Sequence, residues 1–154
     1  MSKLARIVEQ SNNETYNAVI STYKAVRSSI SLELSNEGLT HPQFSVLRVI
    51  AKHGPMSQKR ISREMLVTPP NITGVVDRLE SKHLVRRVAN KEDRRATIIE
   101  LTSEGKRLQE NVAKRYNAFM YGVLQEFTHE EQRTLRTLLT KLEEQILLRR
   151  RKKE

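Results

Sequence analysis

The chain has 154 residues, and its 28 Lys and Arg against 18 Asp and Glu give a formal net charge of +10. This length allows one hydrophobic core, and the charge favours a polyanionic partner, either nucleic acid or an anionic membrane surface. The absence of cysteine excludes disulfides, zinc–cysteine sites and thiol redox sensors.

Neither a metal site nor a membrane segment is expected. The histidines, at positions 41, 53, 83 and 129, are scattered, and none has another histidine four residues away, the spacing that places two ligands on one helical face. The opening residues, MSKLARIVEQ, lack the apolar stretch of a signal peptide, and no run reaches the ~18 apolar residues of a membrane span. We therefore expect a cytoplasmic protein with no membrane partner.

The first part of the chain predicts a long helix and then a shorter one. Residues 3–35 contain few helix breakers, and Gly38 can end the helix. Thr40 and Gln43 form a capping-box pattern for the second helix, with Pro42 in its first turn. The second helix has an apolar stripe that runs up to Gly54-Pro55: Phe44, Leu47, Ile50 and Ala51.

Two shorter helices are predicted next, in the order of a helix-turn-helix. Ser57 can cap the first of them, and Thr68 can cap the second, which then begins with two prolines. In the second of these helices the apolar residues follow i, i+3, i+4, i+7 spacing: Ile72, Val75, Val76 and Leu79. That stripe would face inward and leave the opposite face free to enter a DNA groove.

Residues 82–101, KHLVRRVANKEDRRATIIEL, predict a two-stranded ribbon with a cationic tip. Its basic residues are Lys82, Arg86, Arg87, Lys91, Arg94 and Arg95. Only Glu92 and Asp93 oppose them before the second strand. Because clustered Lys and Arg suit a phosphate backbone, the ribbon and the helix pair before it predict a winged helix-turn-helix.

The last part of the chain predicts two more helices. Thr102-Ser103-Glu104 opens a helix to about Phe127, and Thr128 with Glu131 forms a capping box for another. The final helix has an apolar stripe and then a basic run at 149–153. The stripe consists of Leu135, Leu138, Leu139, Leu142 and Ile146.

The expected fold is mainly α with a small β-wing, in the order four helices, two strands and two helices. A winged helix-turn-helix region at 39–101 would lie between dimerisation helices at 1–38 and 102–154, all in one structural domain. The terminal helices extend beyond what so small a central module can cover. We therefore expect a homodimer, because a two-fold axis buries the same stripe twice; packing on their own domain is the alternative.

The predicted contacts with double-stranded DNA form three groups. Residues for base edges in the major groove are Thr68, Pro69, Pro70, Asn71, Thr73 and Arg78; those for phosphates are Ser57, Gln58, Lys59 and Arg60; those of the wing are Lys91, Asp93, Arg94 and Arg95. Asparagine can pair bidentately with adenine, amides at a helix start suit phosphate, and a narrow minor groove attracts arginine.

Several of these residues have a simpler alternative. Arg78 can instead pair within its own helix, and residues 57–60 can be a solvated helix start. Gly74, on the outward face, costs about 1 kcal/mol relative to alanine. It either allows the backbone to approach DNA closely or is merely tolerated.

Residues 68–84, TPPNITGVVDRLESKHL, and 84–105, LVRRVANKEDRRATIIELTSEG, resemble the MarR (multiple antibiotic resistance regulator) family of winged-helix transcription factors. The family pattern VDRLE-x-K-x-LV, then D-x-R, then L-T-x-x-G is matched at 76–85, 93–95 and 101–105. The helix order matches over essentially the whole chain. The resemblance implies an obligate homodimer on pseudopalindromic operators, with a repressor favoured over an activator.

The resemblance also implies a cleft for a small aromatic or phenolic anion between the dimerisation helices and the DNA-binding lobe. The matching positions are Tyr23, Lys24 and His41, with Arg95 at the base of the wing. There a cation flanked by aromatic rings would hold a carboxylate. Tyr23 can equally be core, Lys24 solvated and His41 an ordinary first-turn residue.

The sequence therefore predicts a sequence-specific, dimeric transcriptional regulator. The alternative is an architectural DNA-binding protein of low specificity, which the net charge and the basic run at 149–153 allow. Asn71 and Thr73 on the outward face of their helix favour base readout. We expect neither an enzyme nor a cofactor, because the chain has no nucleophile elbow, P-loop, GxGxxG or His–carboxylate cluster.

Overall fold

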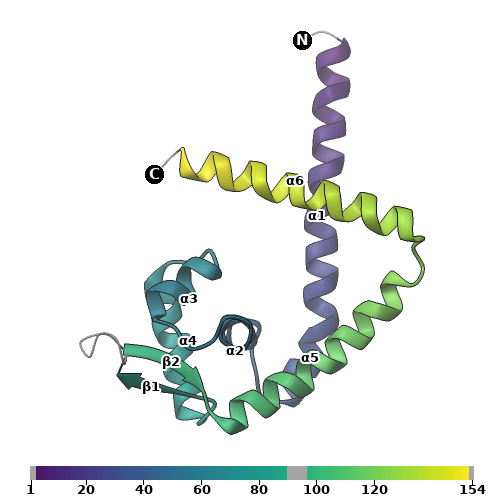
Figure 1. Cartoon of the computed structure of the whole chain (residues 1–154). Coiled ribbons are helices and arrows are strands. Elements are labelled where there is room, and N and C mark those ends of the chain that lie inside the picture. Colours follow the sequence, from purple (N-terminus) through teal and green to yellow (C-terminus); the bar gives the residue numbers. More distant parts are fainter. Residues whose placement is uncertain (1–2, 90–96, 153–154) are drawn as a thin grey trace. The chain divides into compact units, whose positions relative to one another are not determined.

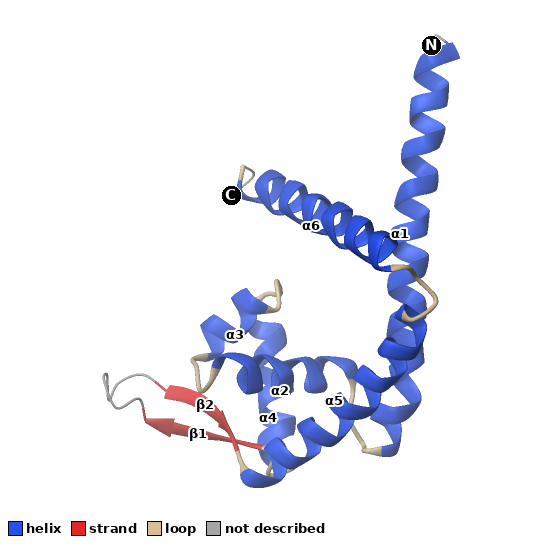
Figure 2. Ribbon diagram, turned by 45° about the vertical axis from the view of Figure 1, so that its right-hand side comes forward, coloured by secondary structure: helices blue, strands red, loops and turns tan. Residues whose placement is uncertain are grey.

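The computed structural model describes residues 3–89 and 97–152, which form helices and one two-stranded sheet (Figures 1 and 2). The helices are α1 (Lys3–Asn36), α2 (His41–His53), α3 (Gln58–Glu64), α4 (Pro69–Ser81), α5 (Ser103–Leu124) and α6 (His129–Arg151). The strands are β1 (Val85–Ala89) and β2 (Thr97–Leu101), between α4 and α5. This order confirms the predicted helical fold with a small β-wing. None of the helices, over the part of the chain described, is long and apolar enough to cross a membrane.

The chain forms two compact units, Met1–Ala113 and Lys114–Glu154. The first contains α1 to α4, the sheet and the start of α5, and the second contains the rest of α5 and α6. The boundary therefore falls inside a helix.

The core of the first unit is built around α2, which contacts α1, α3, α4 and β2. The largest fully buried side chains among the described residues are Leu34, Val46, Leu47, Ile61, Ile72, Val76, Leu79, Val85, Ile99 and Val112. Ala51 was predicted to belong to the buried stripe of α2 but is exposed, whereas Gln43 and Val46 are buried. The buried face of α2 is centred on the side of Val46, which leaves Ala51 at its edge.

The predicted caps begin α2 and α6. The Thr40 amide donates to Gln43 Oε1 at 2.8 Å. The Thr128 amide donates to Glu131 Oε2 at 2.8 Å, and the Glu131 amide donates back to Thr128 Oγ1 at 3.2 Å. The bonds from Thr128 hold the pKa of the Glu131 carboxyl below its ordinary value. α5 ends at Leu124 rather than near the predicted Phe127, because residues 125–127 turn towards this cap.

The sheet is antiparallel, with Val85 opposite Leu101 and Arg87 opposite Ile99. A short third segment joins it, because the Met56 amide donates to the Ile99 carbonyl at 3.1 Å and the Ile99 amide donates to the Met56 carbonyl at 2.8 Å. The loop between α2 and α3 is thus fixed to the wing.

The start of α5 packs directly on the residue before β1. Thr102 Oγ1 donates to the His83 carbonyl at 2.7 Å and accepts from the Gly105 amide at 3.0 Å. Gly105 is buried, and a Cβ atom placed on it would lie 1.8 Å from the Leu84 carbonyl oxygen. The position therefore requires glycine for steric reasons.

Candidate nucleic-acid interface

Helices α3 and α4 form the helix-turn-helix. Ser57 Oγ accepts from the Arg60 amide at 3.3 Å and so caps α3, as predicted. The turn between the helices places Leu66 in the left-handed region, at φ 56°. Helix α4 then buries Ile72, Val76 and Leu79. Its opposite face remains on the surface of the first unit.

The outward face of α4 carries the residues predicted for the major groove. Thr68, Pro69, Pro70, Asn71, Thr73 and Arg78 are all exposed. Thr68 occupies the N-cap position but makes no side-chain capping bond. Gln58 Nε2 of α3 donates to Thr73 Oγ1 at 3.3 Å. A residue predicted to contact phosphate is therefore held beside one predicted to contact a base, at the start of both helices.

Arg78 extends from this face towards solvent. The nearby carboxylates, Asp77 and Glu80, are both bound to Arg87. Among the described residues, Arg78 makes no side-chain hydrogen bond or ion pair, so the alternative of pairing within its helix is not what the structure shows. Gly74 is not required by packing, since a Cβ atom there would lie 4.0 Å from the flexible Arg78 Nη2.

The basic residues at the base of the wing are engaged inside the protein. Arg86 Nε lies 2.5 Å from Glu100 Oε1 on the paired strand, and Lys82 Nζ donates to the Gly38 carbonyl at the end of α1. Arg87 pairs with two carboxylates of α4, whose hydrogen bonds and charges raise its pKa above the ordinary value. The expectation that these three residues extend a cationic ribbon is therefore wrong, since their partners lie within the fold.

The predicted tip of the wing lies outside the described residues. This applies to Lys91, Asp93, Arg94 and Arg95. Lys59 and Arg60 of α3 are described and exposed, and Arg60 Nε lies 3.9 Å from Glu64 Oε1 in the next turn.

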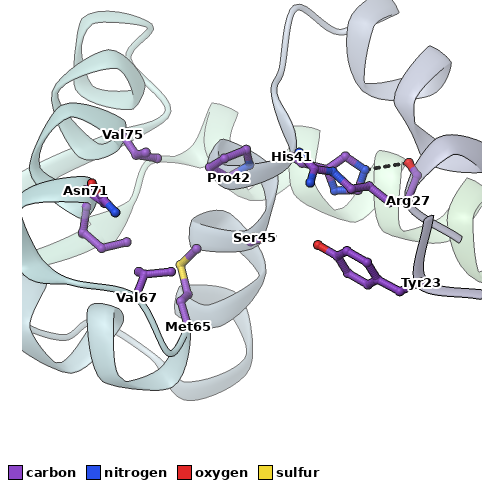
Figure 3. Close-up of a pocket in the computed structure, with 10 residues that line it drawn as sticks. Tyr23, Arg27, His41, Pro42, Ser45, Met65, Val67, Asn71 and Val75 are labelled. Atoms are coloured by element: carbon purple, nitrogen blue, oxygen red, sulfur yellow. Dashed lines mark hydrogen bonds between the residues drawn. The ribbon is translucent and has the colours of Figure 1, made fainter. Parts of the chain in front are cut away.

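A cavity of about 430 Å³ lies in the first unit between α1, α2 and the start of α4 (Figure 3). It is lined by Tyr23, Arg27, His41, Pro42, Ser45, Met65, Val67, Asn71, Ile72 and Val75. His41 Nε2 hydrogen-bonds to the carbonyl oxygen of Arg27 at 2.8 Å. Figure 3 shows Tyr23, Arg27 and His41 on one side and Asn71 and Val75 on the other.

The cation of this cavity is Arg27 and not the predicted Lys24, which is absent from the lining. Each helical residue is turned by about 100° from the one before, so Lys24 points away from the face of Tyr23. Arg27 follows Tyr23 by four residues and shares its face. That spacing was the signal in the sequence that identifies Arg27, and no local signal identified Asn71 as part of the wall.

The second unit leaves the predicted apolar stripe of α6 uncovered. Leu135, Leu138, Leu139, Leu142 and Ile146 are between 37% and 60% exposed. They follow i, i+3, i+4, i+7 and i+11 spacing and therefore share one face of the helix. A continuous apolar face of this kind marks an interaction surface.

Comparison with known proteins agrees with this geometry. The family model described as "MarR family" matches residues 39–97, from just before α2 to the first residue of β2. The HTH-type transcriptional repressor MdtR of Bacillus subtilis (strain 168) is 37% identical over 98 residues, which are 64% of this chain and 63% of MdtR. The HTH-type transcriptional regulator PrsX of Escherichia coli is 31% identical over 121 residues, 77% of this chain and 73% of PrsX.

Comparison with solved structures identifies the same family. The solved structure of a MarR family protein from Bacillus stearothermophilus superimposes with a TM-score of 0.77 at 25% identity, covering 90% of this chain and 97% of that one. Its helices and wing strands follow the same order. The chain therefore belongs to the MarR family of winged-helix, DNA-binding transcriptional regulators.

Proposed function

We propose that this protein is a homodimeric, sequence-specific regulator that binds a pseudopalindromic operator and acts as a repressor. The observation that carries the proposal is the outward face of α4, where Asn71, Thr73 and Arg78 are exposed while Ile72, Val76 and Leu79 anchor the helix. A recognition helix needs this combination of a fixed backbone and exposed polar side chains. The relative MdtR is named a repressor, which favours that sign of regulation.

The exposed face of α6 supports the homodimer. Two copies related by a two-fold axis would cover the same stripe on each other, and two copies of α4 would then face two half-sites. The alternative is an architectural protein of low specificity, which the net charge of +10 allows.

Selection of bound duplexes from a random pool tests the proposal. It is expected to return an inverted repeat with half-site centres about 10 bp apart. Affinity for this selected duplex, measured at one fixed salt concentration, should exceed affinity for random duplex by more than about 10³-fold. A smaller ratio, with no inverted repeat, would support the architectural alternative.

Replacing Asn71 by alanine is expected to cost about 1–3 kcal/mol of binding to the selected duplex and to relax one base position, because the variant cannot form the bidentate hydrogen bonds to adenine. Binding curves on duplexes altered at each position measure this. Ser81→Ala, at the other end of α4, is the control. An equal loss on every duplex would mean that Asn71 only positions the helix.

Replacing Arg94 by alanine is expected to weaken binding strongly and to flatten its salt dependence, because an arginine of the predicted wing would neutralise phosphates beside a narrow minor groove. The slope of log K against log salt should fall by about 0.9 for each phosphate that the variant no longer neutralises. Lys106→Gln on α5 removes the same charge from a residue that is not among the predicted DNA contacts, and it serves as the control. Unchanged affinity in Arg94→Ala would contradict the assignment of the wing.

We also propose that a small aromatic anion occupies the cavity and weakens DNA binding. Arg27 supplies the guanidinium for a carboxylate, Tyr23 supplies an aromatic ring, His41 lies beside them bonded to the Arg27 carbonyl, and the remaining wall is largely apolar. Asn71 lies in the wall that faces Tyr23 and Arg27, so an occupant that holds Asn71 removes it from the DNA groove.

The expected result is that 4-hydroxybenzoate, used as a probe, releases the selected duplex and that Arg27→Gln raises the required concentration about tenfold or more, since it removes a charge-assisted hydrogen bond. Fluorescence anisotropy of the labelled duplex measures both. Lys24→Gln is the matched control and should respond as the wild type does. Equal effects of the two variants would place the anion outside this cavity.

A further inference from the structure

Arg87 is held by α4 through three hydrogen bonds. Its Nη2 donates to Asp77 Oδ1 at 2.6 Å, its Nη1 donates to Glu80 Oε2, and its backbone amide donates to Glu80 Oε1 at 3.2 Å. Asp77 and Glu80 are one turn apart on the recognition helix, so they reach the guanidinium from the same face. Both the main chain and the side chain of this β1 residue are therefore fixed to α4.

The neighbouring arginine shows how specific this arrangement is. Successive residues of a strand point to opposite faces, and Arg86 pairs across the sheet with Glu100 instead. The Arg86 side chain is 66% exposed, whereas that of Arg87 is 29% exposed. Arg87 is thus the more enclosed of the two, and its donors are directed at α4 rather than at solvent.

The two carboxylates create a difficulty for a DNA-binding helix. Asp77 is 55% exposed and stands next to Arg78, on the side of α4 that carries the predicted groove contacts. Negative charge here repels phosphate. A cation brought from β1 offsets that charge and, because a guanidinium is planar and bidentate, also fixes the direction in which the strand leaves the helix.

We propose that Arg87 is a positioning residue that locks the base of the wing to the recognition helix, so that α4 and the wing meet DNA as one rigid body. The inference rests on the DNA binding proposed above. Arg87 itself binds no phosphate; it sets the angle between α4 and the wing, the two elements that would contact DNA. Arg87→Lys keeps the charge but cannot bridge both carboxylates in one plane, and it should retain only part of the function.

Binding to the selected inverted-repeat duplex tests this role of the contact between Arg87 and the two carboxylates of α4, which we call the lock. Arg87→Gln should weaken binding roughly tenfold, and Asp77→Asn combined with it should weaken binding little further, because coupled residues are not additive. The salt slope should stay within about 0.5 of the Lys106→Gln control, since the number of neutralised phosphates is unchanged. A slope lower by about 1.8, two phosphates per dimer at about 0.9 each, would show that Arg87 binds phosphate and would overturn the proposal.

Amide hydrogen exchange in the free protein separates the lock from DNA binding. In the double variant Asp77→Asn, Glu80→Ala, the Arg87 amide loses its acceptor and should exchange about tenfold faster or more, while buried amides of α2 keep their wild-type rates. Unchanged exchange at Arg87 would refute the lock even if DNA binds. If the Arg87 amide exchanges faster in the double variant but the wild-type protein binds no duplex, the contact between Arg87 and α4 stands and the proposed DNA-binding function is refuted.

Discussion

The variant Gly105→Ala is expected to lose about 3 kcal/mol or more of its free energy of unfolding, because its new Cβ atom cannot fit. That atom would lie 1.8 Å from the Leu84 carbonyl oxygen and 2.8 Å from the carbonyl carbon, both of which are backbone. Relief requires moving α5 away from the strand, which disturbs the bond from the Thr102 hydroxyl to the His83 carbonyl. Denaturant titration followed by circular dichroism measures the loss.

Gly74→Ala is the matched control, since it makes the same substitution in a helix of the same unit. Its nearest contact is the end of the Arg78 side chain at 4.0 Å, so the protein should become more stable by up to about 1 kcal/mol through helix propensity. Equal stability of the two variants would mean that α5 can shift from Leu84 at no cost.

The double variant Leu138→Glu, Leu142→Glu is expected to be monomeric and to bind the selected duplex at least about 100-fold more weakly. The two leucines are 60% and 37% exposed in the single chain. Their exposed fractions together amount to about one leucine side chain per protomer. Fully burying a leucine contributes about 1.5–3 kcal/mol, so a symmetric interface that loses these side chains from both protomers loses roughly 3 kcal/mol or more. Sedimentation velocity measures the oligomeric state. Fluorescence anisotropy of the labelled duplex measures the affinity, which falls when a monomer can occupy only one half-site.

Thr137→Glu introduces a charge on nearly the opposite face of α6 and serves as the control. It should leave the sedimentation coefficient unchanged, because residue 137 is turned by about 100° away from Leu138 and out of the stripe. A dimeric Leu138→Glu, Leu142→Glu protein would place the interface elsewhere, and the exposed stripe would then need another partner.

The features that the sequence predicted best are those set by neighbouring residues. Thr40 with Gln43, Ser57, and Thr128 with Glu131 all begin helices as expected, because a capping bond joins residues only three positions apart. The apolar spacing of α4 likewise identified its buried face, and hence the residues on the face that remains exposed.

The features that the sequence did not predict depend on contacts between distant residues. Lys82 reaches the carbonyl of Gly38, a residue 44 positions away, and Arg87 reaches Asp77 only because β1 runs back along α4. From sequence alone, both cations belonged to a ribbon directed at DNA. Composition gives the number of charges in a segment, but only the fold determines which of them are compensated.

Asn71 occupies two surfaces at the same time, being exposed at the start of α4 and part of the cavity wall. A substitution that adapts this helix to a new base would also reshape the cavity, and one selected for a new ligand would also change the helix. The two specificities therefore cannot diverge independently at this position. Among related regulators, a change of residue here should be accompanied by changes at Tyr23 or Arg27 on the facing wall, as a record of that shared constraint.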